Sequence, residues 1–142
     1  MAKLMLRAVD AEDLAVISAC LQDAIVAVSE MTWEQETGRF LFVASRFCWE
    51  GCRDADGAML ERVHSGICID GVFAVRHRGI DRSKRDELLS LLAIRPVEAG
   101  IHLDFAGGGT IRLEAEGILC HLQDIDEPWP TQWRPSHPLE EG

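Results

Sequence analysis

Five of the fourteen lysine and arginine residues lie within ten positions, in the segment 76–85. They are Arg76, Arg78, Arg82, Lys84 and Arg85. The chain as a whole has a net charge of −10, so this cluster opposes the overall sign. Guanidinium groups on a loop can hold a phosphate, a carboxylate or an acidic protein surface through paired hydrogen bonds. The cluster is therefore the first candidate site, unless the neighbouring acids Asp81, Asp86 and Glu87 neutralise it.

A second candidate is acid–base chemistry on the polar side of the segment 100–115. Four polar residues alternate there with apolar ones and are expected on one face, namely His102, Asp104, Arg112 and Glu114. A histidine beside a carboxylate could act as a general base with its orienting group. Cross-strand pairing of Asp104 with Arg112, and of His102 with Glu114, explains the same residues at roughly a few tenths of a kcal/mol per pair. The alternative hypothesis is thus a small-molecule enzyme with His102 as base and Arg112 as anion anchor.

Four residues have the types and rough spacing of zinc ligands, namely Cys48, Cys52, His64 and Cys68. Structural zinc sites use such ligands in closely spaced pairs. On a β-strand, however, His64 and Cys68 would lie about 13 Å apart at a rise of ~3.3 Å per residue. That separation is too long for a shared ion, and ordinary buried cysteines explain the pattern better. We therefore predict no metal and no cofactor.

The C-terminal segment 126–142 contains four of the five prolines and two of the four tryptophans. Prolines favour an extended chain, and tryptophans in such an extension usually attach it to an apolar groove. We expect a tail that packs on the domain through Trp129 and Trp133. Together with Arg134 and His137, the same residues could instead form a strip that binds a partner.

Composition excludes several classes of function. The net charge of −10 disfavours nucleic acid, because phosphate neutralisation needs a basic surface, and it disfavours anionic membranes. No apolar run approaches the ~20 residues that span a bilayer, and the short apolar run that ends at Arg7 is too brief for a secretory signal. The five cysteines are scattered and odd in number, which favours reduced thiols in the cytoplasm. We expect one cytoplasmic domain over residues 1–142.

The elements that must position these residues follow from periodicity. Asp10 is a predicted N-cap, and Leu14 and Ile17 repeat at helical spacing, so an amphipathic helix is expected from Ala11 to about Asp23. Alternating or continuous apolar runs predict strands. These strands are Lys3–Ala8, Ile25–Trp33, Arg39–Trp49 and Leu88–Ile94, the last of them stopped by Pro96.

The segment Gly100–Ala115 alternates apolar and polar residues around a glycine triplet, which is the pattern of a β-hairpin. A three-residue turn at Gly107–Gly109 sets Leu103 opposite Leu113, and the glycines suit the positive φ of such a loop. Because residues opposite one another share a face, this register produces the polar face described above.

Two glycines interrupt the alternation elsewhere. Asp70–Gly71 is either a tight turn between two hairpin strands or a bulge in one long strand over residues 60–78. The bulge is slightly favoured, because Ile69 and Phe73 would then share a face. Near Gly117 the alternation changes phase, which predicts a glycine bulge that re-aims the strand, or else a short helix.

Together these elements predict an α+β fold, a bent mostly antiparallel sheet or small barrel with one N-terminal helix over an open side. A leftover sheet edge could pair between subunits and give a homo-oligomer. For function, the segment 76–85 predicts a binding or regulatory module that meets a small anionic ligand or an acidic protein. The polar face of the hairpin is the alternative, as an enzyme site.

Several segments together resemble a known family. They are Asp10-Ala-Glu-Asp-Leu-Ala-Val-Ile-Ser-Ala, Arg78-Gly-Ile-Asp-Arg-Ser, Leu89-Ser-Leu-Leu-Ala-Ile-Arg, Phe105-Ala-Gly-Gly-Gly-Thr-Ile-Arg-Leu-Glu and Trp129…Pro135-Ser-His137. In combination they are similar to a family of short alphaproteobacterial proteins described as a domain of unknown function. The resemblance covers nearly the whole chain and implies a bacterial, cytoplasmic, single-domain protein, but no activity. Family members usually carry other residues at positions 48 and 52, which counts further against zinc.

Overall fold

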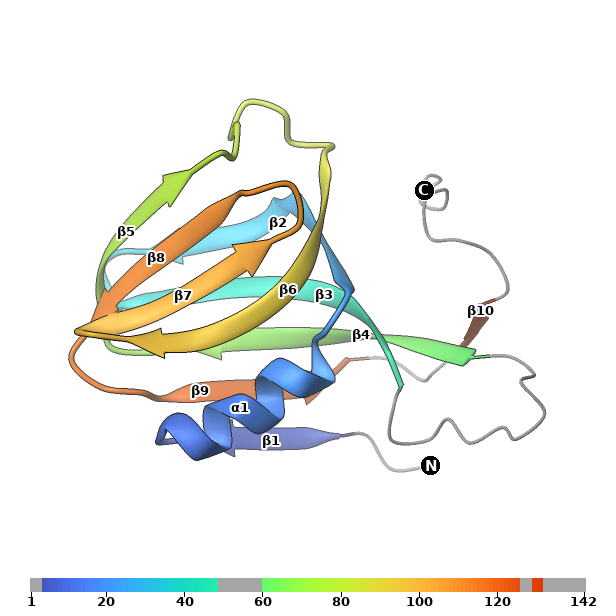
Figure 1. Cartoon of the computed structure of the whole chain (residues 1–142), viewed down its shortest axis with the longest axis horizontal. Helices are drawn as coiled ribbons and strands as arrows, with labels where there is room; N and C mark the ends of the chain where they lie inside the picture. The colour runs from blue at the N-terminus through green and yellow to red at the C-terminus, as the bar shows by residue number, and fades with distance from the viewer. Residues whose placement is uncertain (1–3, 49–59, 126–128, 132–142) are drawn as a thin grey trace.

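The computed structural model in Figure 1 describes residues 4–48, 60–125 and 129–131. Within these residues the chain forms one helix and ten strands. In chain order they are β1 (Met5–Ala8), α1 (Ala11–Cys20), β2 (Ala24–Glu34), β3 (Arg39–Phe47), β4 (Leu60–Ile69), β5 (Val72–Arg78), β6 (Leu88–Val97), β7 (Gly100–Phe105), β8 (Thr110–Ala115), β9 (Cys120–Asp124) and β10 (Trp129–Thr131). From the expected tail, Trp129–Thr131 pairs with β4, whereas Trp133, Arg134 and His137 lie outside the described residues.

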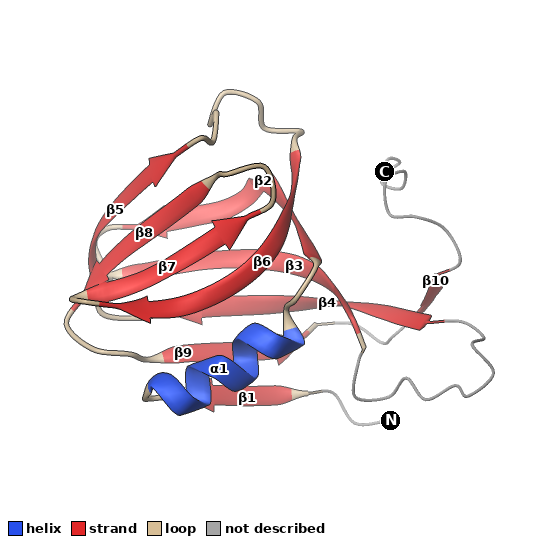
Figure 2. Cartoon of the chain, viewed as in Figure 1, coloured by secondary structure: helices blue, strands red, loops and turns tan. Residues whose placement is uncertain are grey.

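The strands form one bent antiparallel sheet in the order β1-β9-β4-β3-β2-β6-β7-β8-β5, with β10 beside β4. Because β1 and β5 are the two ends of this path, the sheet is not closed. The helix α1 contacts β1 and β6 and covers one side of the sheet, as Figure 2 shows. A mostly-sheet fold with one helix is therefore confirmed, in the form of an open sheet. Among the described residues, no helix is long and apolar enough to cross a membrane.

The helix begins where the sequence predicts and ends earlier. The Asp10 carboxylate accepts a hydrogen bond of 2.8 Å from the Asp13 N–H, which confirms the N-cap. The helix ends at Cys20 because the chain turns directly into β2. Asp23 has a φ of 66°, and its N–H donates to the carbonyl oxygen of Leu91 on β6 at 2.8 Å. This turn makes β2 the neighbour of β6.

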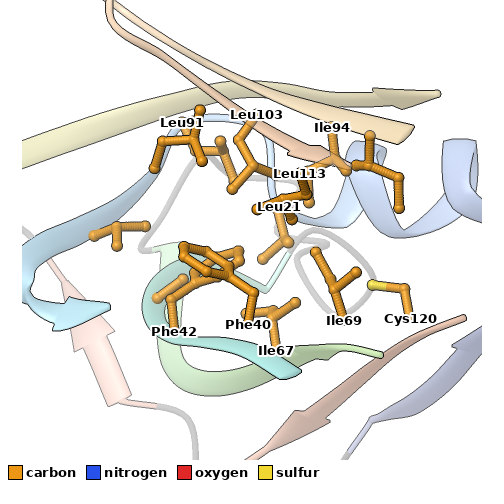
Figure 3. Packing of buried hydrophobic residues seen from close by; sticks show 14 of the residues in the cluster. Leu21, Phe40, Phe42, Ile67, Ile69, Leu91, Ile94, Leu103, Leu113 and Cys120 are labelled. Atoms are coloured by element: carbon orange, nitrogen blue, oxygen red, sulfur yellow. The ribbon is translucent and has the colours of Figure 1, made fainter. Parts of the chain in front are cut away.

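The bend of the sheet places two of its parts face to face, and the core lies between them. Figure 3 shows Leu91, Leu103 and Leu113 on one side of this core and Phe42 and Ile67 on the other. All five side chains are buried. Burying a side chain of this size stabilises the fold by roughly 1.5–3 kcal/mol relative to exposure. The apolar half of each alternating strand therefore faces the inside of the bend.

The hairpin of β7 and β8 confirms the predicted faces, but the predicted register is wrong by two residues. Ile101 pairs with Leu113, and Asp104 with Thr110, so a longer loop replaces the three-residue turn. A shift of two residues leaves every side chain on its face, so the apolar pattern could not distinguish the two registers. The predicted pairs of Asp104 with Arg112 and of His102 with Glu114 are therefore also wrong.

Asp70–Gly71 is a corner between two strands with different partners. β4 pairs with β3 and β9, whereas β5 pairs with β8, so the hairpin alternative is wrong. The favoured bulge in one long strand is also wrong, because the chain is divided there into β4 and β5, and Phe73 is 58% exposed whereas Ile69 is buried. Gly71 has a φ of 74°, and the Asp70 N–H donates to the carbonyl oxygen of Leu119 at 2.9 Å. The corner carries residues 76–78 to the edge of the sheet beside β8.

A second corner lies beside the first, because Leu119 accepts the hydrogen bond from Asp70. β8 ends at Ala115 beside β5 and β7, and β9 starts at Cys120 beside β1 and β4. The predicted bulge at Gly117 is therefore a break between two strands, and Cys120 and Leu122 of β9 are both buried.

The strand β6 does not stop before Pro96, contrary to expectation. Pro96 pairs with Ile101, and the strand ends at Val97. The pairing of β2 with β6 ends at Leu91, so no strand on that side needs the N–H that proline lacks.

Candidate functional site

A hollow of about 420 Å³ opens between the edge strand β5 and the second half of β2. Its lining comes from β2, β3, β5, β8 and the segment 80–85, and consists of Val28, Met31, Trp33, Phe40, Val75, His77, Ile80, Arg82, Ser83, Arg85 and Ile111. On β5, Val75 and His77 face this hollow and alternate with Arg76 and Arg78, which face away from it. The unclosed sheet thus leaves a partly apolar concavity beside the Arg-rich segment.

Two arginines from that segment, Arg82 and Arg85, border the hollow. The acid next to Arg82 in the chain, Asp81, instead accepts hydrogen bonds from the N–H and the hydroxyl of Ser83, at 3.0 and 2.6 Å. These hydrogen bonds lower the pKa of the Asp81 carboxyl. Among the described residues no ion pair joins Arg82 or Arg85 to a carboxylate. The expected neutralisation by neighbouring acids therefore does not occur at these two side chains.

Backbone contacts at both ends hold the Arg-rich segment over the hollow. The N–H groups of Val28 and Ser29 on β2 donate to the carbonyl oxygens of Glu87 and Arg85 at 3.0 Å each. At the other end, Gly79 has a φ of 75°, and a Cβ there would lie 3.1 Å from the Cα of Gly109. This close approach of two backbones needs glycine and fixes where the segment leaves β5.

The outer face of the sheet carries a row of basic residues. Arg95, His102, Arg112 and Arg76 are successive cross-strand partners on β6, β7, β8 and β5. The Glu114 carboxylate lies 2.9 Å from the Arg76 guanidinium and 3.7 Å from that of Arg112. Arg76 thus joins the polar face of the hairpin, which the sequence placed in a separate site. Arg78 lies on the same face, opposite Thr110.

Both ring nitrogens of His102 contact arginines, with Arg95 3.2 Å from Nδ1 and Arg112 3.3 Å from Nε2. A guanidinium only donates, and a neutral imidazole has one accepting nitrogen, so only one of these contacts can be a hydrogen bond at a time. Burial lowers the pKa of His102, the charge of Arg95 lowers it further, and Asp104 opposes the shift only in part. Neither described hollow includes His102.

The charges around His102 predict opposite shifts of its pKa in two variants. Replacing Arg95 with glutamine should raise the pKa of His102, because a neighbouring positive charge is lost. Replacing Asp104 with asparagine should lower it further below the ordinary value of 6.5, because a compensating negative charge is lost. Titration of the imidazole resonances by NMR measures both shifts. Shifts of the same sign in the two variants would contradict this account.

The structure therefore divides the predicted Arg-rich site. Arg82 and Arg85 border the hollow, Arg76 and Arg78 lie on the outer face, and the exposed Lys84 lines neither described hollow. Sequence reasoning missed the lining from β2 and β3, because those residues are more than forty positions away from the arginines. Their only signal was a loosely alternating apolar strand.

Two of the described cysteines, Cys68 and Cys120, have thiols that are held in the protonated form. Burial and the charge of Asp70 raise the pKa of the Cys68 thiol, and burial raises that of Cys120 to about 12. Cys68 lines a second hollow of about 620 Å³, on the outside of β3, β4 and β9. Of the four residues considered as zinc ligands, His64 and Cys68 lie four residues apart on the single strand β4, and Cys52 lies outside the described residues. No group of three potential ligands that could hold a metal ion occurs in residues 4–48, 60–125 and 129–131.

Comparison with known proteins adds a family but no activity. No curated protein and no solved structure matches the chain. A family model described as a protein of unknown function, DUF2948, matches residues 4–137. This match spans nearly the whole chain and confirms the resemblance to a domain of unknown function. The chain belongs to the DUF2948 family.

Proposed function

We propose that this protein is a binding module for a small organic anion, which enters the hollow beside β5 and is held by Arg82 and Arg85. One observation carries the proposal: two guanidinium groups without a carboxylate partner among the described residues border a concavity. Arg7 and Arg78 also form no ion pair among the described residues, so Arg82 and Arg85 are distinguished by their position at the hollow. A bound anion would supply the missing charge through paired hydrogen bonds.

The shape of the site favours a small ligand over an acidic protein surface. Its volume of about 420 Å³ lies within the range of roughly 300–1,000 Å³ that is typical of ligand pockets. A protein surface that met only the arginines would leave the concavity unfilled. The lining contains one histidine, one serine and no carboxylate, which suits binding better than acid–base catalysis.

Charge reversal at the two arginines should abolish binding of a carboxylate probe. Arg82→Glu combined with Arg85→Glu should weaken the binding of octanoate about 100-fold or more, because hydrogen bonds to charged groups are each worth roughly 1.5–3 kcal/mol. Isothermal titration calorimetry measures the dissociation constants.

The matched control combines Arg78→Glu with Lys84→Glu. It changes the net charge by the same amount in the same segment but leaves the lining of the hollow intact. Its affinity should stay within about threefold of the wild type, since neither residue lines the hollow and charges at a distance from the ligand are screened at physiological salt. Equal losses in the two double variants, or no saturable binding of octanoate to the wild-type protein, would overturn the proposal.

A further inference from the structure

The charged side chains of the hollow and most of its apolar ones come from different elements. Its polar side chains are His77 at the end of β5 and Arg82, Ser83 and Arg85 in the segment that follows. The lining from β2, β3 and β8 is entirely apolar. Within one small concavity, the charge therefore comes from one segment of the chain.

The apolar part of the lining is already continuous with the core. Val28, Phe40 and Ile111 are buried, and Met31, Trp33 and Val75 are partly buried and pack against the core. The last three also line the hollow. Apolar surface left in water costs about 25 cal/mol per Å², so a ligand that covers this wall gains affinity in proportion to the area covered.

From this separation of charge we infer the class of ligand, an inference that rests on the proposed function. The ligand is an amphipathic anion, with one charged head at Arg82 and Arg85 and an apolar body against Met31, Trp33 and Val75. An inorganic anion would leave the apolar side chains of the wall exposed to water. A neutral apolar molecule would leave the two guanidinium groups without a counter-charge and partly desolvated.

A homologous series of ligands tests the apolar body. Butanoate, hexanoate and octanoate share one head group and differ only in methylene groups. Each added methylene that enters the hollow should tighten binding about fourfold, the factor that corresponds to the transfer of one methylene group out of water. Octanol, which has the same body as octanoate but no charge, should bind at least tenfold more weakly than octanoate. Calorimetry on the full chain measures all four ligands.

A variant of the wall gives a second, independent measurement. Val75→Asn places a polar group in the apolar wall without changing the charge, and should reduce the ratio of octanoate to butanoate affinity at least fivefold. Phe73→Asn is the matched control, because Phe73 lies on the same strand, is 58% exposed and does not line the hollow. Its ratio should equal that of the wild type. A reduced ratio in both variants, or in neither, would overturn the assignment of the wall.

The outcomes separate this inference from the proposed function. If the three carboxylates bind equally well, the amphipathic ligand is wrong, while the anion site at Arg82 and Arg85 stands. If affinity grows with chain length but octanol binds as tightly as octanoate, the anion site is wrong, and the amphipathic anion fails with it. If none of the probes binds, both proposals fail.

Discussion

Replacing Asp124 with asparagine should lower the free energy of unfolding by about 3–5 kcal/mol, the range for breaking a buried ion pair. The partners are buried: the Arg46 side chain is 0% exposed and that of Asp124 is 6% exposed. Arg46 donates to both carboxylate oxygens at 3.1 and 2.9 Å, and the Ser65 hydroxyl and the Leu4 N–H donate to them at 2.6 and 3.0 Å. Each oxygen therefore accepts two hydrogen bonds from neighbouring groups.

Asparagine has nearly the same shape as aspartate, so the loss measures charge and hydrogen bonding rather than a cavity. Whichever way the amide is oriented, its NH₂ group replaces one accepting oxygen and faces donors. The charge of Arg46 also loses its carboxylate within a buried environment. Chemical denaturation of the wild type and the variant at pH 7 gives the difference.

The same carboxylate makes stability depend on pH. Burial alone would raise the pKa of Asp124, but hydrogen bonds from Arg46, Ser65 and Leu4 together outweigh burial, and the net pKa is lowered. A lowered pKa in the folded state means that this contribution is complete above the ordinary aspartate pKa of about 4 and is lost as pH falls through the folded value. The stability difference between the wild type and Asp124→Asn should therefore shrink below about pH 4.

The exposed ion pair of Arg95 with Asp104 is the control for this prediction. Its side chains are 51% and 23% exposed, so solvent screens their attraction. Asp104→Asn should cost about 1 kcal/mol or less. A loss at Asp124 that is no larger than the loss at Asp104, or a difference that does not change with pH, would contradict a stabilising buried pair.

Gly100→Ala should destabilise the protein by about 3 kcal/mol or more, or prevent folding. An added Cβ at Gly100 would lie 2.2 Å from the carbonyl oxygen of Leu113 on β8, far inside van der Waals contact. Backbone cannot move aside as a flexible side chain can, so β7 and β8 would have to separate. That separation would disturb Leu103 and Leu113, which are fully buried in the core. Urea denaturation monitored by circular dichroism measures the loss.

Gly117→Ala is the matched control for this substitution. A Cβ at Gly117 would meet no atom within 4 Å, and its φ is not in the left-handed region. The free energy of unfolding of this variant should differ from that of the wild type by no more than about 1 kcal/mol. A small increase in stability agrees with the prediction, because alanine reduces the conformational entropy of the unfolded chain. Equal stability of the two variants would mean that Gly100 does not lie against Leu113, and that the register of the hairpin differs from the one described.

The hairpin shows how far sequence reasoning reaches into this fold. Alternation correctly assigned Leu103 and Leu113 to the core and His102 and Arg112 to the outer face. It could not choose between registers two residues apart, because both satisfy the same pattern. The corner at Asp70–Gly71 escaped prediction for a related reason. Local residues show that the chain bends, but not which strand it pairs with afterwards.

The candidate site shows a similar division between local pattern and tertiary contact. Charge clustering located the basic segment, but it grouped residues that the structure separates. Strand alternation turns Arg76 and Arg78 outward, and the turn after Gly79 returns Arg82 and Arg85 to the mouth of the hollow. The sequence contained no marker for the wall opposite them, because Trp33 and Phe40 reach that wall only through the bend of the sheet.

By itself, then, the order of residues determined the local features of this protein: a capped helix, alternating strands with one apolar face, and a basic segment in an acidic chain. These features depend on neighbours a few positions apart, where backbone geometry alone decides which side a residue faces. Only the tertiary structure decided the strand partners, the register and the hollow. Those depend on contacts between residues far apart in the chain, such as the pairing of Phe40 with Ile69, and these contacts form only when the core is buried as a whole.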